Sequence, residues 1–158
     1  MNILATLCYV IDRKHSKTLM LHRVKKENDM HEGKWNGLGG KFEQGETPEE
    51  CVIREVKEES GLTINNPVLH GFITFPKFDG TNDWHVFVFS ADDYSGVQIV
   101  SNEGNLEWIP NGKVTALNLW DGDKIFLDWI YQNKFFTAKF IYEDGKFIDH
   151  SVNFYYDG

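Results

Sequence analysis

The feature that most constrains the fold is a helix that the sequence marks at both ends, from Thr47 to Gly61. Thr47 is a capping residue, Pro48 takes the first helical position, and Glu50 completes a capping box three residues after the cap. Gly61 supplies the left-handed residue at which helices commonly end. The glycine-rich residues 34–42 come shortly before, and predict a short strand or bend that leads into the helix.

On a helical wheel, the side chains of this helix sort into three stripes. Val52, Ile53 and Val56 share one face, which we expect to be buried. An arc of three carboxylates lies beside that face, and the outward arc carries mixed charge. The acidic arc consists of Glu55, Glu58 and Glu59, and the outward arc of Glu50, Arg54 and Lys57.

Two interpretations of the acidic arc are open from the residues alone. Charged helices usually have solvated faces, and Glu50 and Arg54 form an ordinary pair four residues apart. However, like charges beside a core face are partly desolvated, and their repulsion costs stability unless a cation lies among them. Clustered carboxylates suit Mg²⁺, with Mn²⁺ as an alternative, and do not suit zinc. Gly39 and Gly40 allow close backbone approach, so a carbonyl oxygen there can face such a metal.

Length, charge and cysteine usage narrow the class of protein. A chain of 158 residues suits one domain, and a net charge of −8 argues against binding a long nucleic-acid backbone, which needs a basic surface. We expect no membrane partner, since no apolar run reaches the length of a bilayer span and residues 1–14 predict a strand, not a signal peptide. Cys8 and Cys51 are far apart, which predicts free thiols in a reducing, cytoplasmic compartment. The sequence leaves the oligomeric state open.

The remaining pattern predicts more strands than helices. Apolar runs indicate strands over residues 3–11, 18–24, 67–76, 84–91 and 105–110. Residues 121–134 predict an amphipathic helix. Its inward face is assigned to Ile125 and Trp129, followed by Phe126 and Ile130. Residues 137–156 predict a hairpin that turns at Asp144 and Gly145. We therefore expect an α/β domain with a mixed sheet flanked by helices.

Residues 39–62 carry a specific resemblance. They fit the Nudix box, G-x5-E-x7-R-E-U-x-E-E-x-G-U, in which U is a bulky aliphatic residue, at every fixed position. The matching residues are Gly40, Glu46, Arg54, Glu55, Val56, Glu58, Glu59, Gly61 and Leu62. The resemblance implies one Nudix domain over residues 1–158, folded as an α/β/α sandwich with a mixed sheet. It also implies metal-dependent hydrolysis of a nucleoside diphosphate linked to another group.

The same resemblance assigns roles within the site. The implied metal ligands are Glu55, Glu58, Glu59, Glu103 and the carbonyl oxygen of Gly39. These glutamates and Arg54 are the candidate catalytic residues, with Arg54 and Glu46 mainly orienting the site. Glu103 lies outside the box, and without the resemblance it is as readily a loop carboxylate. Metal ions would neutralise the polyphosphate, polarise the attacked phosphorus and lower the pKa of a bound water.

A second resemblance concerns the substrate. Over nearly its whole length the chain is similar to the MutT-homologue subgroup, which destroys oxidised purine nucleoside triphosphates. The segments that carry this similarity are GKWNGLGGK, EESGLT, DWHVFVF and the LW before DGD. It implies hydrolysis of a nucleotide such as 8-oxo-dGTP to the monophosphate and pyrophosphate, which keeps damaged nucleotides out of DNA.

The subgroup implies a pocket for the base. Asn36 matches an asparagine that hydrogen-bonds the base, and Phe75 and Trp120 match aromatic residues that hold it. Without the resemblance, Asn36 is as readily a turn residue, and either aromatic is more readily a core residue.

The chain departs from the subgroup directly after Trp120. Relatives carry two acids that read the base edge, whereas this chain has Gly122 at the first of these positions. Asp123 matches the second acid, and Asp121 is a partial substitute for the first. Lys26 completes the candidate substrate-binding residues.

Two other functions are weighed against this one. A Nudix hydrolase of ADP-ribose or another nucleoside diphosphate derivative is the first, since Pro76 lies near a position where ADP-ribose hydrolases often carry a proline. A proline there also simply ends a strand. The second is a non-catalytic nucleotide-sensing module, which is disfavoured because such modules usually lose box glutamates and all are present here.

Overall fold

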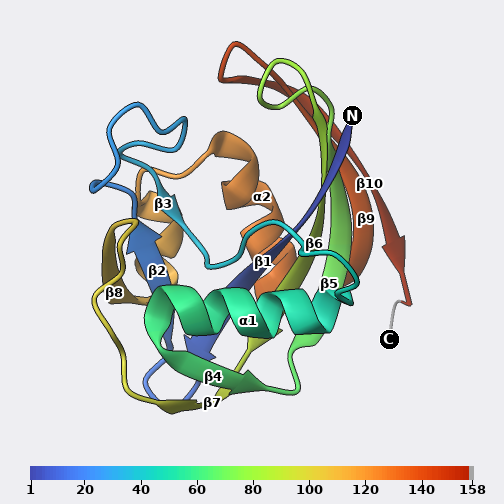
Figure 1. Ribbon diagram of the computed structural model, residues 1–158. Coiled ribbons are helices and arrows are strands. Elements are labelled where there is room, and N and C mark those ends of the chain that lie inside the picture. Colours follow the sequence, from blue (N-terminus) through green and yellow to red (C-terminus); the bar gives the residue numbers. More distant parts are fainter. Residues whose placement is uncertain (157–158) are drawn as a thin grey trace.

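A computed structural model describes residues 1–156, and within them eight strands form one mixed sheet (Figure 1). The strand order is β10-β9-β5-β6-β1-β2-β3, and β8 also pairs with β2. A separate two-stranded sheet joins β4 to β7. The elements are β1 (Asn2–Asp12), β2 (Lys17–His22), β3 (Trp35–Asn36), α1 (Pro48–Ser60), β4 (Leu62–Asn65), β5 (Val68–Phe75), β6 (Asp83–Ala91), β7 (Asp93–Gly96), β8 (Asn105–Pro110), the 3₁₀-helix η1 (Asn111–Ala116), α2 (Asp121–Tyr131), β9 (Phe135–Glu143) and β10 (Lys146–Tyr155).

The sheet is mixed because its chain connections are of two kinds. β1 runs parallel to β6, and β5 runs parallel to β9, whereas the other neighbours are antiparallel. Parallel neighbours need a long crossover connection, and α1 and α2 each lie within one of these two connections. The expected mixed sheet with flanking helices is therefore confirmed.

Both faces of the sheet are covered, which makes the fold an α/β/α sandwich. In β1, Tyr9 belongs to a core cluster that includes α2 residues, while its neighbours Cys8 and Val10 belong to a second cluster that includes α1 residues. Successive strand residues point to opposite faces, so this alternation shows one core on each side of β1.

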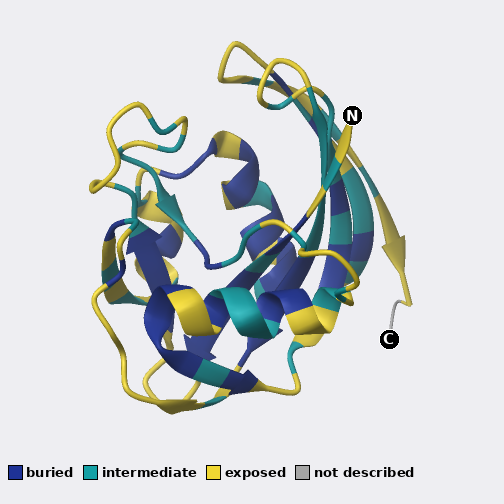
Figure 2. Ribbon diagram, viewed as in Figure 1, coloured by how far each residue is buried: buried dark blue, intermediate teal, exposed yellow. Residues whose placement is uncertain are grey.

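Helix α1 forms as its sequence signals predict. The Thr47 side chain accepts from the backbone N–H of Glu50, and the Glu50 side chain accepts from the backbone N–H of Thr47, so the capping box is present. Gly61 ends the helix with φ of 82°. Val52 and Val56 are fully buried, and Figure 2 shows buried and exposed segments side by side along this helix.

Helix α2 and the C-terminal hairpin agree with expectation in kind and differ in length. α2 ends at Tyr131, three residues before the predicted end. Phe126, Trp129 and Ile130 are buried, as is Leu127, which the sequence assignment omits, whereas Ile125 is only half-buried. The hairpin turns at Asp144 and Gly145, whose φ values of 50° and 77° are those of a type I′ turn.

The largest difference from the expected strands lies around α1. β4 follows the helix directly and pairs with β7, and neither strand is predicted, since both have only four residues. β3 has two residues, and the glycine-rich chain beyond it pairs with β1 through isolated bridges and forms no further strand there. None of the helices within residues 1–156 combines the length and the apolar character needed to cross a bilayer.

Candidate active site

The three carboxylates of the acidic arc differ in exposure. Glu59 is 8 % exposed and the side chain of Glu55 is 16 % exposed, whereas that of Glu58 is 57 % exposed. The prediction that all three are partly desolvated is therefore correct for Glu55 and Glu59 and wrong for Glu58. The reason is angular, because Glu58 lies farthest around the helix from Val52 and reaches solvent.

Arg54 binds the carboxylates around it. Its Nε and Nη2 donate to the two oxygens of Glu46 over 2.7 and 2.9 Å, and its Nη1 donates to Glu55 over 2.8 Å and to Glu58 over 3.2 Å. Nη2 also donates to the carbonyl oxygen of Lys41 over 3.1 Å. Hydrogen bonding from Arg54 lowers the pKa of Glu46 to about 2. This geometry suits the orienting roles expected of Arg54 and Glu46.

Glu59 is the buried end of the acidic arc. Its Oε2 accepts a long hydrogen bond, 3.4 Å, from the backbone N–H of Gly39. Burial raises the pKa of Glu59 well above its usual range, and the carboxylates of Glu103 and Glu55 raise it further. Burial also raises the pKa of Glu55, against the opposing effect of Arg54.

Two glycines bring the chain before α1 against its neighbours. A Cβ on Gly40 would lie 2.6 Å from the Glu55 carboxylate, so this glycine leaves the space that the carboxylate occupies. A Cβ on Gly39 would meet the backbone of Thr6 in β1. The carbonyl oxygens of Leu38 and Gly40 accept from β1, which directs the Gly39 peptide the other way, towards Glu59. The backbone N–H of Gly39, the residue expected to supply a carbonyl ligand, therefore faces the acidic arc.

Glu103 comes from the loop before β8 and faces two cations. Arg23 Nη1 and Lys26 Nζ each lie 3.0 Å from one of its oxygens, and Arg23 also pairs with Asp29 over 2.8 Å. After burial, the charge of Glu103 is the next cause of the raised pKa of Glu59. Lys26, expected to bind substrate, is exposed and is occupied by Glu103.

The oxygen donors of this site fit a hard divalent cation by their chemistry, although they do not converge. Within residues 1–156, no three His, Cys, Asp or Glu side chains are gathered as they are around a bound metal. Arg54 holds Glu55 and Glu58, and Glu103 has its own cationic partners. A cation would relieve the repulsion that raises the pKa of Glu59, and these four carboxylates are the groups that would hold it after side-chain rotation.

A cavity of about 170 Å³ lies next to the acidic arc. Four of the residues expected to bind the base line it, namely Asn36, Phe75, Trp120 and Asp123. Gly39 and Gly40 line it as well, although they also touch Glu59 and Glu55. The candidate base pocket and the carboxylates of α1 therefore share a wall.

Two polar side chains give this mainly apolar cavity its hydrogen-bonding character. Asn36 lies in β3, and its Oδ1 is buried without a hydrogen-bond partner in the described part of the chain. Asp123 is 7 % exposed, and burial raises its pKa to about 7, against the opposing charge of Lys34. A buried acceptor without a partner is costly, so a ligand that donates to Asn36 gains what the free protein lacks.

Aromatic rings form the walls, and several were not predicted from sequence. Trp120 lies 5.0 Å from Phe78 in a T-shaped arrangement, and Phe78 lies 5.5 Å from Phe75. His31, Phe78 and Tyr142 also line the cavity. Phe78 could have been recognised as a large apolar residue in the otherwise polar turn after β5. Tyr142 could have been recognised from the alternation of inward and outward residues along β9. We find no sequence signal for His31.

The two other candidates lie outside this cavity. Asp121 is the first residue of α2 and is exposed, whereas Gly122 and Asp123 turn inward. It therefore does not replace the missing acid, which corrects the sequence expectation. Pro76 follows directly after β5 and begins the turn to β6, so its structural role accounts for it.

The fold and the arrangement of the acidic arc define a known class of protein. Residues 1–130 match the model of the NUDIX domain, and the chain belongs to the Nudix family. It is a Nudix hydrolase, a class that acts on small nucleotides and generally uses a divalent metal such as Mg²⁺.

Particular relatives refine this classification. The chain is 37 % identical over 120 residues to the oxidized purine nucleoside triphosphate hydrolase of Danio rerio, covering 76 % of this chain and 74 % of the relative. It is 36 % identical over 122 residues to an uncharacterized Nudix hydrolase of Bacillus subtilis (strain 168), covering 75 % and 73 %. The crystal structure of the mutator MutT protein from Bacillus halodurans superimposes with a TM-score of 0.84 at 31 % identity, over 96 % of this chain and 97 % of that one.

Proposed function

We propose that this Nudix hydrolase cleaves an oxidised purine nucleoside triphosphate, such as 8-oxo-dGTP, to the monophosphate and pyrophosphate with Mg²⁺ as its metal. Its cellular role would be to remove damaged nucleotides before they enter DNA. The relatives named for oxidised purine nucleotides and for MutT support this substrate class. We also propose a cytoplasmic location, because Cys8 and Cys51 are both buried free thiols.

One observation supports the proposal, namely that the cavity lined by Asn36 and Asp123 lies next to the acidic arc. Asn36 and Asp123 offer hydrogen-bonding groups within an aromatic enclosure, and Gly39 and Gly40 separate that enclosure from the carboxylates of α1 by one strand of backbone. A base held in the cavity therefore presents its phosphates towards α1. This arrangement suits a nucleotide whose base is selected and whose phosphates are attacked.

The chain's own residues have separable tasks in this reaction. Trp120 and Phe75 enclose the base and exclude water from it, while Asn36 fixes its orientation through the amide. Arg54 holds Glu55 at a defined place on α1, and the Gly39 N–H does the same for Glu59. When bound, the metal ion supplies charge neutralisation of the phosphates and an acidified water. Positioning and charge stabilisation then lower the barrier.

A competition assay tests the proposal directly. Purified protein with Mg²⁺ is given 8-oxo-dGTP, 2-oxo-dATP, dGTP and ADP-ribose together at low concentration, and the products are separated by chromatography. We expect an oxidised purine triphosphate to disappear first, with release of pyrophosphate. Preferential cleavage of ADP-ribose would keep the Nudix chemistry and reject the proposed substrate.

The role of Asn36 provides a second test. Asn36→Ala removes the amide that faces the cavity, so kcat/KM should fall more for 8-oxo-dGTP than for a pyrimidine triphosphate. Asn118→Ala is the control, because Asn118 is an exposed asparagine whose amide bonds Lys34 and Gly33, outside the lining of the cavity. An equal loss on all nucleotides would show that Asn36 does not read the base.

A further inference from the structure

The glycine that replaces an acid after Trp120 is explained by a tyrosine from β9. The backbone N–H of Gly122 donates to the hydroxyl of Tyr142 over 2.7 Å. A Cβ on Gly122 would lie 2.6 Å from that hydroxyl and 2.8 Å from Cδ1 of Phe140. Any larger residue at position 122 therefore collides with β9. Gly122 and Tyr142 form one unit, in which the phenol fills the space beside the glycine.

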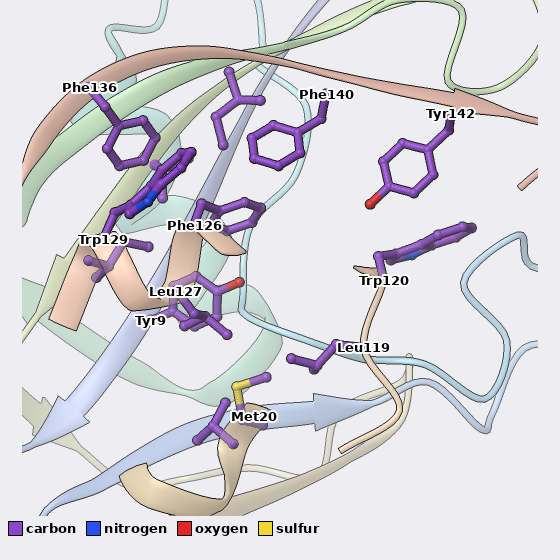
Figure 3. Close-up of a cluster of buried hydrophobic side chains, with 14 residues drawn as sticks. Tyr9, Met20, Leu119, Trp120, Phe126, Leu127, Trp129, Phe136, Phe140 and Tyr142 are labelled. Carbon is purple, nitrogen blue, oxygen red and sulfur yellow. The ribbon is translucent and has the colours of Figure 1, made fainter. Parts of the chain in front are cut away.

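Tyr142 is held in the wall of the candidate base pocket. It lines the same cavity as Asn36 and Asp123 and is 6 % exposed. Its ring meets those of Trp120 and Phe78 edge to face, with centroids 5.6 and 5.3 Å away. Figure 3 shows Tyr142 beside Trp120, with its hydroxyl directed away from β9. The neighbouring rings thus fix the position of the hydroxyl.

The Tyr142 hydroxyl has unused hydrogen-bonding capacity. A tyrosine hydroxyl donates once and has two acceptor positions, and Gly122 uses one of the acceptor positions. Within residues 1–156 this is the hydroxyl's one hydrogen-bond partner. Burial raises the pKa of Tyr142, and the nearby charge of Asp123 raises it further, so the O–H stays protonated. A neutral donor is therefore free at the wall of the cavity.

We propose that the Tyr142 hydroxyl is a specificity-determining group that donates a hydrogen bond to the 6-carbonyl oxygen of an oxopurine base. An acid at position 122 would accept from ring or amino N–H groups when ionised, whereas this phenol offers a donor of fixed position and no charge. The inference rests on the proposed function, since it requires a purine base in this cavity. Asn36 and Asp123 then read the remaining polar groups of the base.

Binding of monophosphates in the absence of metal tests this without requiring turnover. The ligands are dGMP, 8-oxo-dGMP, the deoxynucleotide of 2-aminopurine, which lacks the 6-carbonyl, and dCMP, measured by calorimetry. In the wild-type protein we expect both oxopurines to bind more tightly than the 2-aminopurine nucleotide. In Tyr142→Phe, the Kd of the oxopurines should rise about three- to tenfold while that of the 2-aminopurine nucleotide stays within about twofold.

Controls separate this outcome from a general effect. Tyr155→Phe removes a hydroxyl from a half-exposed tyrosine on β10, outside the lining of the cavity, and should change none of the four Kd values. The wild-type comparison of dGMP with its 2-aminopurine analogue can overturn the inference even if Tyr142→Phe folds poorly. Equal affinity for these two ligands would overturn the inference.

The same data distinguish the two proposals. If wild-type protein binds dGMP and 8-oxo-dGMP no more tightly than dCMP, the proposed purine site fails and this inference fails with it. If the purines bind selectively but Tyr142→Phe weakens all of them equally, the proposed function stands and the role of Tyr142 in reading a carbonyl is rejected.

Discussion

The indole N–H of Trp120 donates to Nδ1 of His31 over 2.8 Å, and the two rings meet edge to face at 87°. An indole nitrogen only donates, so Nδ1 must be unprotonated for this bond to exist. Burial, followed by the charge of Arg23, lowers the pKa of His31 against the opposing charges of Asp29 and Glu103. His31 is therefore a neutral acceptor that holds one wall of the candidate base pocket in place.

His31→Leu should loosen that wall, whereas His31→Asn keeps an acceptor near Nδ1. We expect His31→Leu to raise KM about two- to tenfold, corresponding to one neutral hydrogen bond, and to leave kcat nearly unchanged. His31→Asn should remain close to wild type. Because the lowered pKa lies below 6.5, the wild-type KM should also rise as the pH falls below 6.5, and His31→Asn should lack this rise. Steady-state kinetics from pH 5 to 8 would contradict the role if both variants followed the wild-type profile.

Asp123 predicts a dependence of stability on pH. Its pKa is raised from 3.8 to about 7, so the folded protein retains a proton that the unfolded chain has lost. The contribution of Asp123 to the free energy of unfolding is therefore fully present below pH 4 and is lost as the pH rises through about 7. At about 1.4 kcal/mol per pKa unit, ionisation of this buried group costs on the order of 4 kcal/mol, or roughly 10 °C in Tm.

Asp123→Asn removes that titration. Between pH 5 and 8.5 its Tm should fall less than the wild-type Tm, because the remaining fall comes from other buried carboxylates such as Glu59 and Glu55. Asp121→Asn is the matched control, because Asp121 is exposed two residues away and should keep the wild-type profile. Parallel melting profiles for wild type and Asp123→Asn would show that Asp123 does not carry a raised pKa.

Glu59→Gln tests the metal assignment by stability as well as by turnover. Burial and the charges of Glu103 and Glu55 disfavour the ionised form of Glu59, and glutamine does not ionise, so the metal-free variant should melt at a higher temperature than wild type. Turnover should fall by orders of magnitude. For wild type, Mg²⁺ at a hundred times its Kd should add about 2.7 kcal/mol of stability, and Glu59→Gln should lose most of this gain. A full Mg²⁺ effect on the melting of Glu59→Gln would remove Glu59 from the ligand set.

Gly39 and Gly40 should respond differently to alanine. In Gly40→Ala the new methyl meets the flexible end of Glu55, which rotates away, so kcat should fall at least about tenfold with little change in Tm. In Gly39→Ala the methyl meets the backbone of Thr6, which cannot move without disturbing β1. We expect Gly39→Ala to destabilise the fold by about 2 kcal/mol or more. Circular dichroism melts and single-turnover rates distinguish the two, and similar effects of both substitutions would contradict this division.

The parts of the molecule predicted from sequence are those specified by residues close together in the chain. The capping box at Thr47 and Glu50, the stop at Gly61 and the turn at Asp144 depend on neighbours a few positions apart. These features can therefore be recognised from the sequence without knowing the fold. The helical wheel already places Glu58 farthest of the three carboxylates from Val52, but the sequence does not show how far around the helix the surrounding core extends, so the exposure of Glu58 was misjudged.

The parts that were missed depend on contacts between distant segments. His31 meets Trp120 across 89 positions, and Tyr142 meets Gly122 across 20, so no local pattern marks either pair. Gly122 illustrates this limit of sequence analysis. The sequence shows only that an acid is missing at this position, whereas the structure shows that the Tyr142 phenol occupies the space that a side chain would need.

The hydrogen bonds of Arg54 bear on how strongly a divalent ion can be held. Its guanidinium occupies oxygens of Glu55 and Glu58, which are two of the expected metal ligands. Arg54 is thus the counter-ion of these two carboxylates in the metal-free protein. An incoming metal ion must compete with Arg54 for the same oxygens. The free energy of metal binding is therefore reduced by the free energy needed to break the hydrogen bonds of Arg54 to Glu55 and Glu58. Any change that strengthens the hydrogen bonds between Glu46 and Arg54 should therefore raise the metal affinity, although neither residue contacts the ion.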